Sequence, residues 1–292
     1  MTECTGRRDD RPPLAYADVT SPPRAKVYGM GSRLQGKVAI ITGASRGLGE
    51  YCAVAYGAEG ATVAVAARTE KPANEHLPGT IYETAEKVTA AGGEGFPIVC
   101  NTADQESVNA MVSTVLERYG RIDVLINNAA ILPPGSMTTV KPRHWELEMK
   151  VNVSGPFFVI RAVLPTMVGQ RSGSIINISS KGADTFHGHY GVSKRALEAM
   201  TIAFSSEVAD LGIAVNCLKP VGAIETPGMR LGNHDRSLFQ GLPPADRYVE
   251  AAILLGLLTP DVGTGLIYDD AEVVARWASE PLRSQLAALP MR

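Results

Sequence analysis

The sequence carries little excess charge of either sign. Its 28 lysines and arginines nearly balance 30 aspartates and glutamates, which leaves a formal net charge of -2. A broad basic surface of the kind that binds DNA or RNA is therefore excluded, although a small local site for an anion is compatible with this balance. The sequence predicts no nucleic-acid partner.

Long apolar runs are also missing. The longest strongly apolar stretch, Ala251–Leu258, falls far short of the about 20 residues that a membrane-spanning helix needs, so no membrane partner is expected. Residues 1–35 are polar and rich in proline, and they lack the apolar core of a secretory signal. We therefore expect a Pro-rich N-terminal arm on a cytoplasmic protein.

Cysteine is scarce. The four cysteines form no Cys-x-x-Cys motif and lie far apart, at positions 4, 52, 100 and 217. This pattern indicates reduced thiols in the core of a cytoplasmic protein rather than a disulfide framework or a redox pair. His187 and His189 have no further ligands at a convincing metal-binding spacing, so no metal site is predicted and both are assigned to a loop or a pocket wall.

What the sequence does contain is a regular alternation of short apolar runs and helical segments. Strands are expected at 38–41, 62–66, 95–100, 122–126, 174–178 and 213–217, with 267–268 as a candidate seventh. Helices are expected at 48–58, 80–91, 106–119, 145–168 and 190–210, and Pro156 and Pro165 should kink or divide the fourth. The alternation predicts an α/β fold, a single Rossmann-type doubly wound parallel sheet of about seven strands with helices on both faces. The domain is expected at 36–270, between the arm and a C-terminal tail at 271–292.

A glycine-rich turn, Thr42-Gly43-Ala44-Ser45-Arg46-Gly47-Leu48-Gly49, joins the first expected strand to the first helix. Gly43 permits a tight turn, Gly47 lets the backbone approach a pyrophosphate, and Gly49 allows close packing of helix on strand. The helix N-terminus then offers N–H groups and partial positive charge to phosphates. Such turns also occur without a ligand, but the strand before and the helix after this one favour a dinucleotide site.

Five motifs in chain order carry a resemblance to a known family. They are the glycine turn, Asn127-Asn128-Ala129-Ala130, Val151-Asn152-Val153-Ser154-Gly155, the serine pair Ser179-Ser180, and Tyr190-x-x-x-Lys194. Each motif is weak alone, whereas together they span about residues 36–226 and resemble the short-chain dehydrogenase/reductase family. The resemblance implies an NAD(P)-dependent oxidoreductase acting on CH–OH and C=O groups, assembled as a homotetramer or homodimer.

The resemblance also assigns catalytic roles to Asn152, Ser180, Tyr190 and Lys194. Tyr190 would exchange a proton with the substrate oxygen, and Lys194 on the same helix face would favour its phenolate. Ser180 would hydrogen-bond the same oxygen, and Asn152 would hold a water beside Lys194. An ordinary exposed Tyr–Lys pair is the alternative.

Some positions depart from the family pattern. The loop from Ser180 to Tyr190 is about three residues short of that motif spacing, so Ser179 stays an alternative to Ser180. Asn101 replaces an acidic residue that usually meets the adenine, and Pro220-Val221-Gly222 replaces Pro-Gly. The segments 71–80 and 220–226 resemble a subgroup typified by hydroxysteroid dehydrogenase-like protein 2, here without a sterol-carrier domain.

The coenzyme expectation follows from charge. An NAD site usually ends its second strand with an acidic residue for the ribose, whereas this strand ends in Arg68-Thr69. Arg46 and Arg68 stand where a 2′-phosphate could be gripped, so NADP(H) is favoured, while NAD(H) and two ordinary surface arginines remain alternatives. The resemblance places the coenzyme against Gly43, Ser45, Arg46, Gly47, Leu48, Gly49, Arg68, Asn101, Thr102, Asn128, Ala129, Tyr190, Lys194, Ile224 and Thr226.

The sequence thus predicts hydride transfer between NADP(H) and a small carbonyl or alcohol substrate. The apolar residues after Thr226 favour a hydrophobic substrate, although they could equally cover the core; they are Met229, Leu231, Leu238, Phe239 and Leu242. A catalytically silent dinucleotide-binding sensor or scaffold is the alternative from another class. A dehydratase or epimerase on the same fold is a third.

Overall fold

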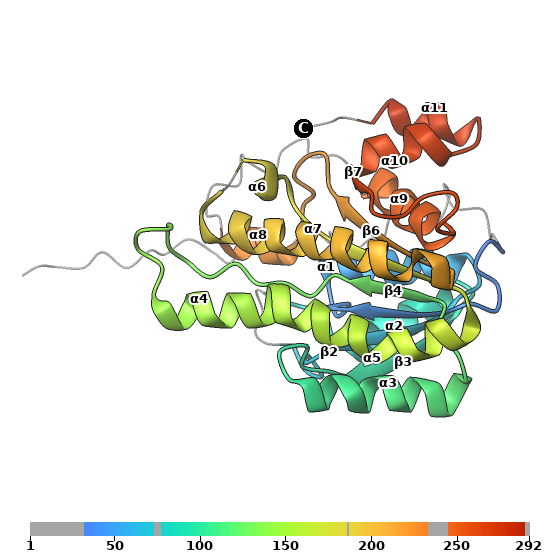
Figure 1. Cartoon of the computed structure of the whole chain (residues 1–292), viewed down its shortest axis with the longest axis horizontal. Coiled ribbons are helices and arrows are strands. Elements are labelled where there is room, and N and C mark those ends of the chain that lie inside the picture. The colour runs from blue at the N-terminus through green and yellow to red at the C-terminus, as the bar shows by residue number, and fades with distance from the viewer. Residues whose placement is uncertain (1–31, 73–76, 186, 233–244, 290–292) are drawn as a thin grey trace, which may run out of the picture.

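The computed structural model describes residues 32–72, 77–185, 187–232 and 245–289. In these ranges the chain forms a seven-stranded parallel sheet in the order β3-β2-β1-β4-β5-β6-β7 (Figure 1). The strands are Val38–Thr42 (β1), Thr62–Ala67 (β2), Glu94–Val99 (β3), Val124–Asn127 (β4), Gly173–Ile178 (β5), Ile213–Lys219 (β6) and Ile267–Asp269 (β7). The predicted doubly wound sheet is confirmed, with the candidate strand at 267–268 as its seventh member.

Helices cover both faces of the sheet. One layer contains Gly47–Ala58 (α1), Ile81–Ala90 (α2), Asp246–Gly256 (α9), Asp270–Trp277 (α10) and Leu282–Ala287 (α11). The other contains Gln105–Tyr119 (α3), Gly155–Gln170 (α5) and Gly188–Val208 (α7). Shorter helices are Pro142–Met149 (α4), Lys181–Asp184 (α6) and Pro227–Gly232 (α8), and a 3₁₀ turn at Ala209–Leu211 (η2) follows α7.

The central strand β1 shows why its apolar run is continuous. Val38 and Ile40 belong to the core on the α3, α5 and α7 side, whereas Ala39 and Ile41 belong to the core on the α1, α2 and α9 side. Because successive side chains of a strand point to opposite faces, a strand covered on both sides must be apolar at every position.

The chain order reverses between β1 and β4, which are neighbours in the sheet. Ala39 pairs with Val63 of β2 on one side and with Val124 of β4 on the other. Ligands of open α/β sheets bind outside the carboxyl ends of the strands at such a switch point. The glycine turn follows β1 and Asn128 follows β4, so the topology brings both to this place.

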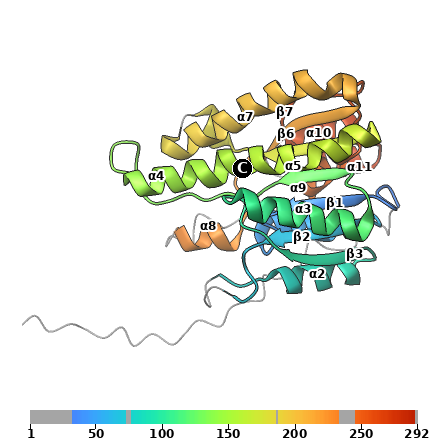
Figure 2. The ribbon, with the colours of Figure 1, turned by 60° about the horizontal axis from the view of Figure 1, so that its bottom comes forward.

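The long helix expected at 145–168 is divided. A π-helical turn at Lys150–Ser154 (η1) separates α4 from α5, and Pro156 sits in the first turn of α5, where its missing N–H is harmless. Pro165 lies inside α5, which continues through it. Within the described residues, the stretch 142–170 forms one nearly continuous helix. By length and composition, this helix is long and apolar enough to cross a membrane. In this fold Val159, Ile160 and Val163 of that helix are buried against the sheet, and α7 runs alongside it (Figure 2).

Both ends of the described chain pack onto the sheet unit. Leu34 is fully buried, and Arg33 pairs with Glu59 and Glu250, so residues 32–35 of the expected arm belong to the folded body. Residues 1–31 lie outside the described residues. The expected tail at 271–292 instead contributes α10 and α11, whose Val273, Val274 and Leu286 join the core beside α9.

The strand β3 and the helix α2 pack so closely that position 95 requires glycine. A Cβ added to Gly95 would lie 2.0 Å from the carbonyl oxygen of Ala85, which is a backbone atom that cannot turn aside. Gly95→Ala is therefore expected to lower the free energy of unfolding by about 1–3 kcal/mol, the usual range for overpacking. Urea denaturation measures the change.

The matched control is Gly169→Ala, because nothing lies within 4 Å of an added Cβ at that exposed position of α5. Alanine should stabilise the helix there by about 0.5–1 kcal/mol. Equal effects of the two substitutions would contradict the packing of α2 on β3.

Candidate active site

The glycine turn after β1 takes the backbone shape that its sequence predicts. Gly43 and Gly47 have φ values of 66° and 60°, which side-chain-bearing residues rarely adopt. A Cβ at Gly43 would lie 2.7 Å from the Cα of Ala129, and one at Gly49 would lie 2.4 Å from the side-chain nitrogen of Asn128. These glycines therefore let the segment after β4 pack directly on the turn.

Asn128 fastens the two strand ends together. Its side-chain amide donates to the carbonyl oxygens of Thr42 at 2.9 Å and Gly43 at 3.1 Å. The Thr42 hydroxyl in turn accepts from the backbone N–H groups of Asn128 and Ala129 at 3.1 and 3.2 Å. The side-chain amide of Asn128 therefore holds the turn in shape. It leaves the N-terminus of α1 open beside the turn.

Arg46 and its surroundings fit the phosphates of a dinucleotide. Arg46 precedes α1 and provides no side-chain cap, so the first N–H groups of that helix stay available. Its Nη2 donates to the Gly79 carbonyl at 3.0 Å, while its Nε is buried with no hydrogen-bond partner among the described residues. A buried guanidinium nitrogen without a partner is costly, and burial lowers the pKa of Arg46. A bound anion would satisfy it.

Arg68 lies on the surface beyond β2. It lines an open depression with Thr69, Glu70 and Lys71, and the Glu70 carboxylate accepts a hydrogen bond from the Tyr82 hydroxyl at 2.9 Å. Lys71 is a second cation at this depression that the sequence reasoning did not select. It stands directly before a segment that includes the undescribed residues 73–76, and no motif singles it out.

The remaining predicted coenzyme residues lie on the segments after β3 and β6. A Cβ at Gly47 would lie 3.3 Å from the Thr226 side chain, and Ile224 is buried nearby in sequence. The side-chain oxygen of Asn101 accepts from the N–H of Ala103 at 3.2 Å and caps its own turn. Thr102 packs against Gly155 at the start of α5. Of the apolar residues expected over the substrate, Leu238, Phe239 and Leu242 lie outside the described residues.

Tyr190, Lys194 and Ser180 come together where β5 meets α7. Tyr190 occupies the first turn of α7, and the Lys194 Nζ lies 5.6 Å from its ring centroid on the same helix face. The Lys194 ammonium donates to the Ile178 carbonyl at 2.7 Å. The Ser180 side chain hydrogen-bonds that of Tyr190, and a Cβ at Gly182 would lie 3.5 Å from both Ser180 Oγ and the tyrosine ring.

Burial shifts both titratable groups of this cluster toward their neutral forms. It raises the pKa of Tyr190 to about 12, with the Glu148 charge adding to the rise and the Ser180 hydrogen bond opposing it. It lowers the pKa of Lys194 to about 8, against opposing contributions from Cys217 and Glu148. Tyr190 is therefore a protonated acid at neutral pH, suited to giving a proton away.

The two candidate serines have different environments. Ser179 is buried and its hydroxyl donates to Glu198 at 2.8 Å, whereas Ser180 caps α6 by accepting from the Gly182 N–H at 3.1 Å and lies beside Tyr190. The serine hydroxyl at the cluster is thus that of Ser180.

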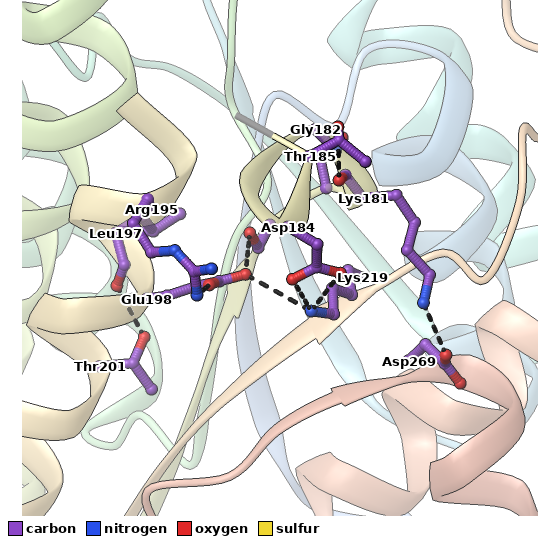
Figure 3. A network of polar contacts seen from close by, with 12 residues as sticks. Lys181, Gly182, Asp184, Thr185, Arg195, Leu197, Glu198, Thr201, Lys219 and Asp269 are labelled. Carbon is purple, nitrogen blue, oxygen red and sulfur yellow. Dashed lines mark hydrogen bonds and ion pairs between the residues drawn. The ribbon is translucent and has the colours of Figure 1, made fainter. Parts of the chain in front are cut away.

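A network of charges holds the short loop that follows Ser180. Lys219, at the end of β6, donates to both carboxylate oxygens of Asp184 at 2.7 and 2.8 Å and lies 3.8 Å from Glu198 (Figure 3). Lys181 pairs with Asp269 at the end of β7 at 3.1 Å. The ends of two strands therefore fix α6, and the sequence reasoning named none of these residues.

The side-chain amide of Asn152 is bonded within the protein. Asn152 is fully buried in η1, its side-chain oxygen accepts from the Ile131 N–H at 2.9 Å, and its side-chain nitrogen donates to the Ile131 carbonyl at 2.9 Å and to Ser193 Oγ at 3.1 Å. The π turn thus aims this amide at the loop after β4. The expected water beside Lys194 stays a prediction.

Ser193 is hydrogen-bonded into a pair of buried residues that the sequence reasoning missed, Glu148 and His189. Its hydroxyl bonds Glu148 at 2.9 Å, and Glu148 contacts His189. His189 was assigned to a loop or pocket wall, but it is buried in the first turn of α7. Glu148 carried a usable signal, since it lies four residues before Asn152 and so on the same helical face. Among the described residues, no cluster of three or more His, Cys, Asp or Glu could hold a metal ion.

Comparisons with known proteins agree with this geometry. Residues 37–236 match the family described as short chain dehydrogenase. The 3-oxoacyl-[acyl-carrier-protein] reductase FabG of Thermotoga maritima is 38% identical over 198 residues, covering 67% of this chain and 77% of that protein. Hydroxysteroid dehydrogenase-like protein 2 of Bos taurus is 33% identical over 202 residues, covering 68% of this chain and 48% of that protein. The chain thus aligns with about half the length of this second relative.

Solved structures are similar over most of the chain. A putative dehydrogenase from Xanthomonas campestris has a TM-score of 0.76 at 29% identity and covers 83% of this chain and 90% of that one. A metagenomic short-chain oxidoreductase in complex with NADP has a TM-score of 0.67 at 27% identity, covering 82% and 99%.

Burial of Lys194 makes a prediction about stability. Each pKa unit corresponds to about 1.4 kcal/mol. Lowering the pKa of Lys194 from 10.5 to about 8 therefore costs the folded state about 3 kcal/mol at pH 7. Lys194→Met removes that cost and loses a hydrogen bond to Ile178 of about 1 kcal/mol, for a net gain of about 2 kcal/mol. Denaturant unfolding at pH 7 measures it.

The sign of the pH dependence follows from proton counting. Between about pH 8 and pH 10 the unfolded chain holds the lysine proton that the folded chain has lost, so wild-type stability rises and the gain of the variant disappears. Lys37→Met, at a partly exposed lysine paired with Asp123, is the control and should give no gain. A destabilised Lys194→Met variant would contradict the argument.

Proposed function

Because the chain belongs to the short-chain dehydrogenase/reductase family, oxidoreductases that act on CH–OH or C=O groups, we propose that it transfers a hydride between NADP(H) and a carbonyl or alcohol substrate. The observation that carries the proposal is the juxtaposition of Ser180, Tyr190 and Lys194. The glycine turn and the open N-terminus of α1 lie at the switch point beside it.

The proton chemistry belongs to the chain itself. When bound, the nicotinamide supplies or accepts the hydride. Tyr190 gives its hydroxyl proton to the substrate oxygen during reduction and takes it back during oxidation. Ser180 hydrogen-bonds the same oxygen as charge develops on it, and Lys194 favours the phenolate left behind.

NADP(H) is the coenzyme that the charges support best. The Nε of Arg46 is buried without a partner among the described residues. Arg68 and Lys71 line one depression beyond β2 together with Glu70, which gives it a net positive charge. Arginine matches phosphate with two parallel hydrogen bonds, which suits a 2′-phosphate. The solved relative in complex with NADP supports the same choice.

The substrate is proposed to be hydrophobic. Leu132 and Met137, on the loop after β4, are 61% and 54% exposed, and Met137 lies beside Gly188 at the start of α7. Apolar side chains left open on a loop whose Met137 backbone approaches the start of α7 favour an apolar ligand. The FabG relative makes a 3-oxoacyl thioester a reasonable first probe.

Assembly and location complete the proposal. Phe157 of α5 and Ile202 of α7 are 43% and 51% exposed on neighbouring helices, as a homodimer or homotetramer interface would require. The described cysteines, Cys52, Cys100 and Cys217, are free and buried, in keeping with a reducing cytoplasm.

Tyr190→Phe tests the mechanism. Loss of the proton donor should lower the rate of NADPH-dependent reduction by about 10²–10⁴-fold without changing NADPH affinity. Rates are measured with acetoacetyl coenzyme A, decanal, cyclohexanone and a 3-ketosteroid. In the wild type, oxidation of the matching alcohol should accelerate with rising pH, because burial holds the pKa of Tyr190 at about 12 and only the phenolate accepts a proton.

Tyr119→Phe, in α3, is the control and should behave as wild type. Undiminished reduction by Tyr190→Phe would refute the assigned acid. Tight NADPH binding by the wild type without turnover of any probe would instead favour the sensor or scaffold alternative.

Removing Arg46 and Arg68 together tests the coenzyme. The double alanine variant should lose at least about tenfold of its NADPH affinity and little of its NADH affinity, because only NADPH carries the 2′-phosphate. Fluorescence titration of each coenzyme measures this. Arg171→Ala, at the C-terminus of α5, is the control; a preference for NADPH that survives the double substitution contradicts the proposal.

A further inference from the structure

Glu148 and His189 form a buried pair directly beside the catalytic tyrosine. Glu148 lies in the last turn of α4 and His189 precedes Tyr190 in the first turn of α7, and both side chains are almost completely excluded from solvent. The Nδ1 of His189 contacts the carboxylate of Glu148. The mechanism proposed above uses neither residue.

The hydrogen bonds of His189 require an additional proton in the pair. Its Nε2 lies 3.0 Å from the Gly135 carbonyl oxygen, which can only accept, so Nε2 must carry hydrogen. Its Nδ1 contacts a carboxylate oxygen of Glu148, and that contact also needs a hydrogen on one side or the other. The pair therefore holds one proton between the two groups and is neutral overall.

This pair belongs to a network that spans three segments. The other Glu148 oxygen accepts from the Ser193 hydroxyl at 2.9 Å, and that hydroxyl accepts from Asn152, whose amide holds the backbone of Ile131. His189 and Asn152 thus fasten the loop at 131–135 at two points, Gly135 and Ile131.

The first turn of α7 depends on this network for its position. His187, its N-cap residue, makes no side-chain cap hydrogen bond among the described residues, and the next residue, Gly188, has a φ of 55°. The Ser193 hydroxyl also lies 2.9 Å from the Tyr190 carbonyl oxygen, so its single hydrogen is shared between that oxygen and Glu148. His189 and Ser193 therefore supply the fixation that a capping side chain would otherwise give.

We propose that Glu148 and His189 are positioning residues that share one buried proton and hold Tyr190 against the loop at 131–135. The consequence for catalysis rests on the proposed function. The Glu148 charge acts on Tyr190 and Lys194 of α7, and the described part of the loop bonds His189 through the Gly135 carbonyl. A charge on Glu148 raises the pKa of Tyr190 and opposes formation of its phenolate, so a proton shared with His189 lessens that opposition.

The proton is tested first, without reference to turnover. Nitrogen NMR of the full chain labelled at histidine should show a proton on Nε2 of His189 at neutral pH. His189→Phe assigns the signal. A His189 that carries hydrogen on Nδ1 alone overturns the shared proton.

Positioning is tested with variants that separate charge from hydrogen bonding. Glu148→Gln keeps every bond, because its amide donates to Nδ1 and its oxygen accepts from Ser193. Glu148→Leu removes them. In chains labelled at tyrosine, the Tyr190 signal, assigned by Tyr190→Phe, should broaden or shift in Glu148→Leu and stay in place in Glu148→Gln. An unchanged signal in Glu148→Leu refutes the positioning role, whether or not the chain turns over any ketone.

Turnover is measured with the most active carbonyl compound of the four-probe panel. Glu148→Leu should lose about tenfold or more in kcat with little change in the KM for NADPH, as expected when an acid is misplaced, whereas Glu148→Gln should stay within about threefold. Tyr56→Phe is the matched control, since it removes one buried hydrogen bond, to Ala252, in the α1–α9 layer. It should change stability but not kcat.

The double variant Glu148→Leu/His189→Phe separates positioning from general stability. Apolar replacement of a whole buried pair often restores stability, so its melting temperature should recover relative to Glu148→Leu while kcat stays low. Recovery of both would mean that the pair is merely structural. A wild type that reduces no probe would overturn the proposed function and leave the two NMR results standing.

Discussion

The side-chain amide of Asn128 is the interaction on which the geometry of the site depends. By donating to the carbonyls of Thr42 and Gly43, it locks the end of β4 to the glycine turn after β1. The chain then runs straight into the loop whose Ile131 and Gly135 backbones are held by Asn152 and His189. One short segment, 127–135, therefore connects the glycine turn to the helix that carries Tyr190. In the proposed reaction a hydride donor and a proton donor act on one carbonyl group, so that reaction needs a common anchor for both.

The same site works against the stability of the fold. Burial disfavours the charged forms of both Lys194 and Tyr190, and the enzyme chemistry needs each of them charged at some stage. The surrounding residues limit this cost locally: the Ile178 carbonyl receives the lysine ammonium, and Ser180 bonds the tyrosine hydroxyl. Nearby, Glu198 is buried but receives Ser179 and Arg195. Buried charge is tolerated here because each group has partners of its own.

Much of this could be predicted from local patterns in the sequence. The seven strands and the glycine turn depend on periods of a few residues, which one sequence displays directly, and the motif around Tyr190 and Lys194 depends on helical spacing. The sequence could not predict which of Ser179 and Ser180 lies beside Tyr190. This depends on the side from which Glu198 approaches the chain. Glu148 and His189 are 41 residues apart, and Lys219 and Asp184 are 35 apart, so no local pattern joins them. The docking of α10 and α11 also lay beyond such patterns, since it is decided by tertiary packing on α9.

In the proposed mechanism, two independent sets of contacts position the groups that meet the substrate oxygen. Ser180 is positioned from one side, because Lys219 and Lys181 tie α6 to the ends of β6 and β7. Tyr190 is positioned from the other side, where the first turn of α7 meets the loop after β4. A productive site tolerates displacements of only about 0.5 Å, so relaxation of either set of contacts separates two groups that must reach the same atom. The loop between Ser180 and Tyr190 is short and has little slack with which to absorb such a movement. Ion pairs therefore fix the Ser180 side of this short loop, and hydrogen bonds fix its Tyr190 side.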